Sequence, residues 1–386
     1  MIGGRVHSGS FLPHGALPRG GLARVGQPIA APIARLGIVL VLAFCLWSSI
    51  GAAAPAALAP PTARELVGQR FVVAMKGTSP SSALLERVRR GEIGGVILFG
   101  SNIENPAQLR RLTVALQEAA RDAGRPTLLI ATDQEGGRVR RLPWAGPVPS
   151  TTALGRLNPT AIRAQALASG KALRLSGVNV DLAPVADAPR AGSFMALEER
   201  TFSADTATVA GATVAFAKGL AGARVAAAVK HFPGIGRATR NTDRTAVEIA
   251  ASRAELSGTD LVPFRAAIAA GAPIVMISNA TYPALDSKPA PWSPKIQSLL
   301  RGALGFQGVT ISDSLDGAAA TRGRGVASVA TLAAQAGVDL LLLTGSEASS
   351  AAAFERVAAR AERGGIAPAA LRASYGRIVA LKRVVG

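Results

Sequence analysis

The sequence predicts an α/β fold, a single (β/α)8 barrel of TIM type, preceded by an N-terminal signal or anchor segment. Eight short apolar runs alternate with segments of helical periodicity between residues 66 and 386. The runs are almost continuously apolar, as expected for parallel strands that are covered on both faces. Eight such units in about 320 residues match the size of a barrel, and a doubly wound open sheet is the alternative.

The predicted strands are spaced so that a helix fits after each of them. They are residues 71–75, 95–99, 127–132, 178–183, 226–231, 273–278, 309–312 and 338–344.

The segments between these strands carry helix start and stop signals. One helix is predicted to begin at Asn105, a good capping residue, with Pro106 at the first helical position. We expect it to end at Gly124, because glycine tolerates the backbone conformation that closes a helix. Residues 252–270 and 293–304 have similar periodicity and are each predicted to be helical.

Residues 1–60 have the pattern of a targeting segment. No acidic residue precedes Glu65, and the apolar stretch 36–50 has the length of a signal-peptide core. Small residues follow it and offer cleavage sites. We therefore expect an exported protein, secreted or anchored in the cell envelope. Lipidation at Cys45 is an alternative, which the bulky Phe44 before it disfavours.

The predicted domain boundaries follow from this segment. Residues 1–60 form the signal peptide or anchor with its linker, and residues 61–386 form one catalytic domain. No composition break or Pro/Gly linker divides the second part.

Composition excludes several kinds of site. The chain has one Cys and three His, and His231 is the only histidine beyond residue 60. An intrachain disulfide, a cysteine-rich zinc module and a multi-histidine metal site are therefore excluded, and we expect no cofactor and no metal. Aromatic residues make up 4% of the chain, which argues against base-stacking surfaces for single-stranded nucleic acid.

The charge balance points to anionic surroundings. The chain has 43 Lys+Arg against 24 Asp+Glu, a formal net charge of +19. Such a charge favours acidic cell-wall polymers or lipid head groups as surroundings. The basic residues are scattered singly or in pairs without a run of five, so nucleic acid is not expected as a partner. A soluble surface that simply favours arginine is the alternative.

Polar residues gather directly after the predicted strands. In a barrel, the groups that do chemistry lie at the carboxyl ends of the strands. The segments at these positions are 133–141, 181–187, 230–236, 278–279 and 312–314. Most of them contain charged or amide side chains, so the sequence predicts an active site at this end of the barrel.

Four motifs in this part of the chain resemble the bacterial β-N-acetylhexosaminidases of glycoside hydrolase family 3, the NagZ type. Residues 133–141 (DQEGGRVRR) resemble the family's D-x-E-G-G-x-V-x-R element, and residues 230–234 (KHFPG) match its K-H-F-P-G signature. Residues 197–202 (LEERTF) and 311–315 (ISDSL) resemble two further family segments. The resemblance covers nearly all of residues 66–386.

The resemblance implies a role for each matching residue. Asp313 is expected to be the nucleophile of a retaining glycosidase, which attacks through a carboxylate. The residues expected to bind the sugar are Asp133, Arg141, Arg200, Lys230 and His231. Structural alternatives are a helix cap for Asp313 or Asp133, a salt bridge for Lys230 and a satisfied core position for His231.

The sequence departs from the family pattern at the proton donor. The family uses a histidine paired with an aspartate on the loop after the fifth strand, and these positions hold Asp243 and Asn241 here. Asp243 is therefore the candidate acid/base, with Glu248 as an alternative. The basic loop residues Arg240 and Arg244, together with Arg237, would lower the pKa of Asp243 or contact an acidic aglycone.

The expected function is hydrolysis of terminal, non-reducing β-linked N-acetylglucosamine from peptidoglycan or muropeptide fragments or chitooligosaccharides, by a monomer. A β-glucosidase is a second enzymatic interpretation, although longer glucosidases of the family usually carry an added domain. A catalytically weak sugar-binding wall protein is a third, because the His–Asp pair is absent. A nucleic-acid binder would instead show steep salt-dependent DNA binding and no sugar affinity.

Overall fold

A computed structural model describes residues 61–386 of the chain. The predicted targeting segment, with Cys45 in it, lies outside the described residues. Within 61–386, none of the helices combines the length and the apolar character needed to cross a membrane.

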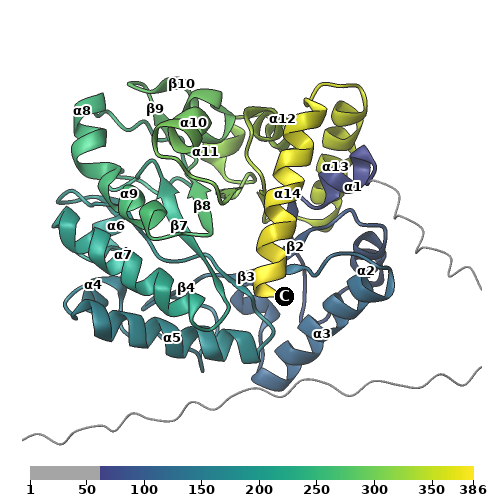
Figure 1. Ribbon diagram of the computed structural model, residues 1–386, viewed down its shortest axis with the longest axis horizontal. Helices are drawn as coiled ribbons and strands as arrows, with labels where there is room; N and C mark the ends of the chain where they lie inside the picture. Colours follow the sequence, from purple (N-terminus) through teal and green to yellow (C-terminus); the bar gives the residue numbers. More distant parts are fainter. Residues whose placement is uncertain (1–60) are drawn as a thin grey trace, which may run out of the picture. The chain divides into compact units, whose positions relative to one another are not determined.

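Eight parallel strands form the central sheet of the described residues (Figure 1). Their order is β11-β8-β7-β6-β3-β2-β1-β12, so strands that follow each other in the chain also lie next to each other. The strands are β1 (Phe71–Ala74), β2 (Gly95–Ile97), β3 (Leu129–Thr132), β6 (Val180–Asp181), β7 (Ala226–Phe232), β8 (Ile274–Ile277), β11 (Val309–Ser312) and β12 (Leu341–Leu343). Each falls inside or overlaps one predicted strand.

The sheet closes between its first and last strands. Ile311 of β11 and Leu340 beside β12 form a parallel bridge. The backbone N–H of Ser312 donates to Leu340 O over 2.9 Å, and the N–H of Leu340 donates to Thr310 O over 2.8 Å. The prediction of a (β/α)8 barrel is confirmed, and the alternative of an open doubly wound sheet is wrong because both edges are paired.

Helices surround the barrel (Figure 1). They are α1 (Ala63–Gly68), α2 (Ser82–Arg89), α3 (Pro106–Asp122), α4 (Thr151–Leu154), α5 (Pro159–Leu175), α6 (Phe194–Leu197), α7 (Thr206–Ala221), α8 (Arg253–Glu255), α9 (Val262–Ala269), α10 (Pro294–Ser298), α11 (Ala318–Thr321), α12 (Val326–Ala336), α13 (Glu347–Glu362) and α14 (Pro368–Val385). Short 3₁₀ turns, η1 (Gly100–Asn102) and η3 (Ala290–Trp292), and π turns, η2 (Leu256–Asp260) and η4 (Leu299–Ala303), complete the set.

The helix predicted from Asn105 is α3, and its signals act as expected. The Asn105 side chain accepts from Gln108 N over 2.9 Å, and Pro106 is the first helical residue. Gly124 beyond its end has a φ of +65°. The helix predicted over 252–270 is instead divided into α8, the π turn η2 and α9. The extra residue of a π turn has no signature in hydrophobic periodicity.

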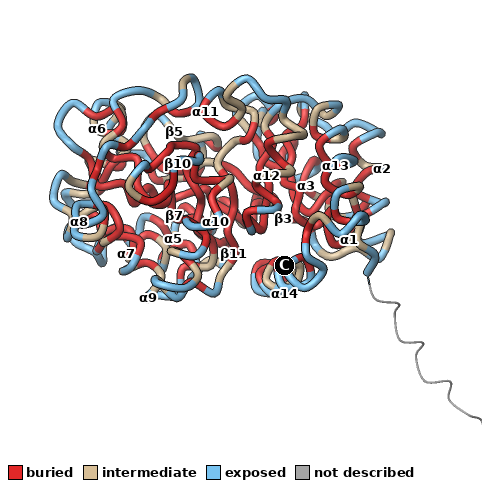
Figure 2. The backbone as a smooth tube through the Cα atoms, turned by 90° about the horizontal axis from the view of Figure 1, so that it is seen from above, coloured by how far each residue is buried: buried red, intermediate tan, exposed pale blue. Residues whose placement is uncertain are grey.

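Buried residues form two clusters, one between strands and helices and one inside the barrel. Figure 2 shows the buried residues in the interior and the exposed ones around the outside. The inner cluster contains inward-facing strand residues together with Ile378, Leu381 and Val385 of α14. The same helix contacts β11, and its Lys382 donates to the side chain of Gln69, which lies just before β1. Helix α14 therefore covers the amino ends of the strands and leaves their carboxyl ends free for a site.

Two short hairpins were not predicted. One consists of β4 (Gln134–Gly136) and β5 (Val139–Arg140), and the other of β9 (Thr281–Tyr282) and β10 (Asp286–Pro289). The first turns the segment after β3 back over the end of the barrel. Its tight turn needs Gly136, which has a φ of +108° and whose Cβ would lie 2.5 Å from Pro149 O.

Candidate active site

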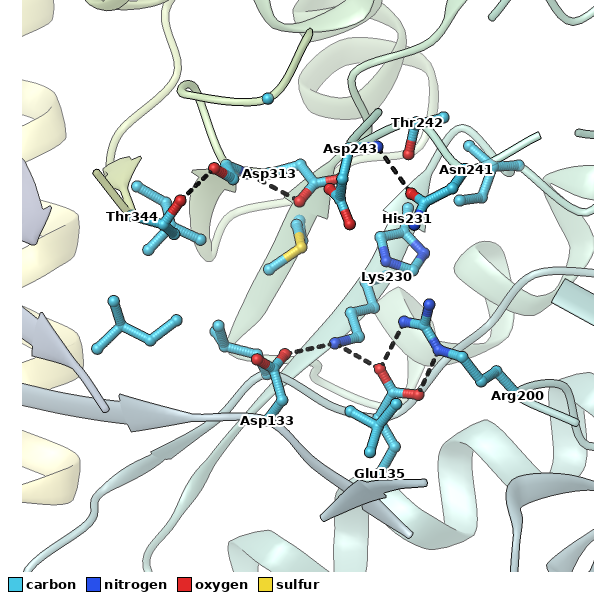
Figure 3. A pocket seen from close by; sticks show the side chains of 18 of the residues that line it. Asp133, Glu135, Arg200, Lys230, His231, Asn241, Thr242, Asp243, Asp313 and Thr344 are labelled. Carbon is cyan, nitrogen blue, oxygen red and sulfur yellow. Dashed lines mark hydrogen bonds and ion pairs between the residues drawn. The ribbon is translucent and has the colours of Figure 1, made fainter. Parts of the chain in front are cut away.

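A cavity of about 380 Å³ opens at the carboxyl ends of the strands. Asp133 follows β3, Lys230 and His231 lie near the end of β7, and Asp313 follows β11. All seven predicted site residues line this one cavity. They are Asp133, Arg141, Arg200, Lys230, His231, Asp243 and Asp313, and Figure 3 shows most of them converging on it.

Glu135 is the centre of an ion-pair network on one side of the cavity. Its Oε1 lies 2.8 Å from Lys230 Nζ and 2.8 Å from Arg200 Nη2, and its Oε2 accepts from Arg200 Nε over 2.9 Å (Figure 3). Lys230 Nζ also donates to Asp133 Oδ1 over 2.9 Å. Lys230 therefore forms the salt bridge that was given as its structural role, and it also lines the cavity.

These contacts keep Glu135 and Lys230 charged. Burial alone would raise the pKa of Glu135, but Lys230 and Arg200 outweigh it and hold that pKa well below its usual value. Burial would also lower the pKa of Lys230, but Asp133 and Glu135 raise it above its usual value. Lys230 can therefore donate to sugar hydroxyls at any physiological pH.

Arg141 borders the same side of the cavity but is held more loosely. Its Nη2 lies 3.7 Å from Asp133 Oδ2, and its guanidinium lies 6.0 Å from the ring centroid of Phe99. The backbone N–H of Arg141 donates to the buried Gln134 side chain over 2.9 Å. Gln134 therefore sets the path of the loop that carries Arg141.

His231 is oriented by a buried carboxylate. Its Nδ1 lies 2.7 Å from Oδ2 of Asp187, and Oδ1 of Asp187 accepts from Ile235 N over 2.7 Å. Because the carboxylate accepts a hydrogen bond at Nδ1, the neutral ring carries its proton there. Nε2 is then left as an acceptor toward the cavity that His231 lines.

Asp313 and Asp243 lie close together on the other side of the cavity (Figure 3). Burial raises the pKa of Asp313 to about 6, and the adjacent negative charge of Asp243 adds to this shift. One Asp313 oxygen accepts from Ser314 N over 2.8 Å. Asp313 is therefore ionised at neutral pH but gains a proton in mildly acidic solution.

Asp243 is held in place through its backbone. Its N–H donates to Asn241 Oδ1 over 2.8 Å, and its carbonyl accepts from Ala318 N over 3.0 Å. The second bond ties the loop after β7 to α11, on the segment that follows Asp313. Asn241, at the family's aspartate position, thus shapes the loop that presents the Asp243 side chain.

Other acidic and basic residues of this loop do not line the cavity. Glu248 is exposed and pairs with Thr281 in a parallel bridge, so it is poorly placed as the alternative acid/base. Arg237 forms ion pairs with Asp260 (3.1 Å) and Glu255 (3.2 Å). Among residues 61–386, no group of three or more His, Cys, Asp and Glu side chains is arranged to hold a metal ion.

Comparison with known proteins identifies the family. Residues 62–381 match the glycosyl hydrolase family 3 N terminal domain. The chain belongs to glycosyl hydrolase family 3. It is therefore a glycosyl hydrolase, and the resemblance inferred from its motifs is confirmed.

Sequence relatives of this family 3 chain span most of its length. An uncharacterized secreted glycosyl hydrolase of Arthroderma benhamiae is 34% identical over 350 residues, which cover 88% of this chain and 98% of the relative. A beta-hexosaminidase of Stenotrophomonas maltophilia is 37% identical over 283 residues, which cover 71% of this chain and 82% of the relative.

Solved structures of the family have the same fold. A family 3 beta-N-acetylglucosaminidase from a Paenibacillus species superposes with a TM-score of 0.81 at 32% identity, covering 84% of this chain and 63% of that structure. A beta-N-acetylhexosaminidase from Beutenbergia cavernae gives a TM-score of 0.75 at 33% identity, covering 84% of this chain and 99% of that one.

Sequence reasoning missed two residues that organise the site. Glu135 belongs to a recognised motif but was not assigned a role, and Asp187 was noted only as a polar residue after a strand. Each is almost fully buried, at 2% and 0% exposure. A buried carboxylate next to the carboxyl end of a strand needs a cationic or N–H partner. The acidic residues among the apolar surroundings of these strand ends were therefore the available signal for a role in the site.

Proposed function

We propose that this family 3 enzyme hydrolyses terminal, non-reducing β-linked N-acetylglucosamine with retention of configuration. The pairing of Asp313 with Asp243 in the cavity carries the proposal. A retaining glycosidase needs one carboxylate as nucleophile and a second carboxyl group as acid and base on either side of the scissile bond. The relatives named for beta-hexosaminidase activity and for beta-N-acetylglucosaminidase activity support the choice of sugar.

Asp313 would act as the nucleophile. In the first step its carboxylate bonds to the anomeric carbon while Asp243 gives its proton to the leaving oxygen, so that the alcohol departs. In the second step Asp243 takes a proton from water, and the water oxygen displaces Asp313 from the anomeric carbon. The proton taken from water restores the acid form of Asp243, and Asp313 is released as a free carboxylate.

The opposite side of the cavity would hold the sugar. Asp133 has oxygens that can accept from sugar hydroxyls, while Lys230, Arg200 and Arg141 can donate to sugar oxygens. The fixed Nε2 of His231 offers one further acceptor. The ion pairs around Glu135 support this role because they hold these side chains in one arrangement before substrate arrives.

Muropeptides and other peptidoglycan fragments are the substrates we favour, with chitooligosaccharides next. The exposed Arg240 and Arg244 lie on the loop that carries Asp243. Acidic groups such as lactyl or peptide carboxylates on the aglycone would find cationic partners there. Export of the chain, which its first 60 residues predict, would bring it to these polymers.

The second candidate is a sugar-binding protein that hydrolyses its ligand slowly or not at all, because an aspartate stands where the family has a histidine. A β-glucosidase specificity is a further one. Activity of the full chain on 4-nitrophenyl β-N-acetylglucosaminide, compared with the glucoside, tests both. We expect release from the first substrate and little from the second. Binding of N-acetylglucosamine without release would favour the sugar-binding protein.

Variants assign the two carboxylates. Asp313→Asn should abolish release. Asp243→Asn should keep most of kcat/KM on the 4-nitrophenyl glycoside, whose phenol leaves without protonation, although kcat falls because the second step loses its base. On a disaccharide kcat/KM should fall about 10²–10⁴-fold. Glu248→Gln is the matched control and should behave as the unmodified enzyme. Equal losses on both substrates in Asp243→Asn would count against its role as the acid.

A further inference from the structure

A second concave surface lies on the outer wall of the barrel, between α12 and α13. Its volume is about 540 Å³. We call it the arginine groove; it is lined by Arg324, Ser328, Thr331, Leu332, Gln335, Arg356, Arg360 and Arg363. Four of these eight residues are arginines, and none is acidic.

The arginines of the groove have no carboxylate partner among residues 61–386. The acidic residues nearest to them in α13 are turned elsewhere: Glu355 lies 2.6 Å from Arg64, and Glu362 lies 3.9 Å from the same side chain. An ordinary charged surface intersperses both signs. This groove has one sign only, and it therefore carries a concentrated positive potential.

Helix stability does not account for this arrangement. Arg356, Arg360 and Arg363 follow one another at spacings of four and three residues, so they share one face of α13 and repel each other by a few tenths of a kcal/mol per pair. The negative end of the helix dipole does stabilise the positive charges of Arg360 and Arg363, but not that of Arg356. Arg324, in contrast, stands just before α12, at the positive end of that helix.

The backbone is fitted to one of the arginines. A Cβ at Gly365 would lie 2.1 Å from Nε and 2.4 Å from Cζ of Arg360. The Arg360 guanidinium therefore lies against the Gly365 backbone, and a side chain at residue 365 would displace it. Gln335 at the same end donates to Gly365 O over 2.8 Å.

The groove starts at the catalytic end of the barrel and runs away from it. Helices of a (β/α)8 barrel run back from the carboxyl ends of the strands, so Arg324 lies on the catalytic side and Gln335 on the far side. Helix α12 has 11 residues and is about 16 Å long. Cations spaced along such a length fit a linear polymer with repeated anions better than a single small anion.

We infer that the arginine groove binds an anionic envelope polymer with repeating phosphodiester groups. Guanidinium groups bind phosphate oxygens in pairs, and the hydroxyl of Ser328 adds a donor, whereas the Thr331 hydroxyl already donates to Ala327 O over 2.8 Å. No exposed large apolar side chain lies in the groove for insertion into a lipid surface; those present are Val148, Leu157, Leu175, Leu197 and Val384. The nearest aromatic side chain is Trp292, whose ring is covered by the Arg324 guanidinium at 5.6 Å, and no aromatic residue lines the groove itself for stacking on bases.

Binding of labelled poly(glycerol phosphate) to the full chain tests this inference. Arg356→Gln/Arg360→Gln/Arg363→Gln should weaken binding roughly tenfold and flatten its dependence on salt. The matched control Arg110→Gln/Arg111→Gln/Arg163→Gln removes the same charge from exposed positions outside the groove and should bind normally. Gly365→Ala should weaken binding without any change of charge, because it displaces Arg360.

Separate probes distinguish the sources of affinity. A polyuronate, a short DNA duplex and vesicles containing phosphatidylglycerol should each bind more weakly than poly(glycerol phosphate), with less response to the groove variants. Equal losses in both triple variants, or tighter binding of any other probe, would overturn the inference. Hydrolysis of 4-nitrophenyl β-N-acetylglucosaminide should stay unchanged in all groove variants, so this result is independent of the proposed function.

Discussion

Oε1 of Glu135 and Nζ of Lys230 lie 2.8 Å apart, and both side chains are almost completely buried. Glu135 lies in the hairpin after β3, and Lys230 lies near the end of β7. Arg200 and Asp133 complete a network of two carboxylates and two cations. Such a network is stable only while each charge keeps its partner. It holds the polar groups on this side of the cavity in one geometry.

Removal of the central charge should therefore destabilise the enzyme. Glu135→Gln leaves Lys230 and Arg200 with less compensation, and we expect the free energy of unfolding to fall by about 3 kcal/mol. Urea denaturation at neutral pH measures this. Glu248→Gln, an exposed change of the same kind, should have little effect. A loss in Glu135→Gln no larger than in this control would contradict the role of the network.

Asp187 should fix the tautomer of His231. In Asp187→Asn the amide can donate to Nδ1, so Nε2 would carry the proton and present a donor instead of an acceptor. We expect affinity for N-acetylglucosamine to fall roughly tenfold, as for one lost hydrogen bond to a buried group. Nitrogen NMR of the ring reports the tautomer directly. Weaker binding with an unchanged tautomer would point to a purely structural role.

The activity should decline as the pH falls through about 6. The pKa of Asp313 is raised to about 6, so the proposed nucleophile is ionised above this pH and protonated below it. Asp243→Asn removes the adjacent negative charge and should move the acidic limb of kcat/KM to lower pH. An acidic limb that stays in place in this variant would show that Asp313 and Asp243 do not interact.

Asp313 should also make the protein less stable at neutral pH. Its folded-state pKa lies above the usual value of 3.8, so the unfolded chain loses this proton first and stability falls as the pH rises from 3.8 to about 6. Asp313→Asn should therefore raise the melting temperature more at pH 7 than at pH 4. An equal change at both pH values would contradict the raised pKa.

Lys382 should give the opposite pH dependence. Burial lowers its pKa to about 7, and its Nζ donates to Gln69 Oε1 over 2.6 Å; within residues 61–386 it has no carboxylate partner. The unfolded chain binds this proton more tightly, so this residue's contribution to stability rises as the pH increases from about 7 to 10.5. Lys382→Met should therefore stabilise the protein more at pH 7 than at pH 10. Denaturation at the two pH values measures the difference.

The barrel and the position of its site could be predicted because strands buried on both faces are continuously apolar and end in polar residues. Lys230 shows this well, since it directly follows the apolar residues 226–229 near the end of β7. The contact of Glu135 with Arg200 could not be predicted, because it joins side chains 65 positions apart through the path of two loops. The π turn η2 was missed because it disturbs a helix by a single residue.

Trapping of the covalent intermediate tests the central claim most directly. The full chain would be incubated with a 5-fluoro analogue of N-acetylglucosaminyl fluoride, which forms the glycosyl-enzyme faster than water removes it. Intact-mass analysis should show one added sugar, and peptide mapping should place it on Asp313. A sugar attached to another residue such as Asp243, or no attachment by an enzyme that hydrolyses N-acetylglucosaminides, would contradict the assignment.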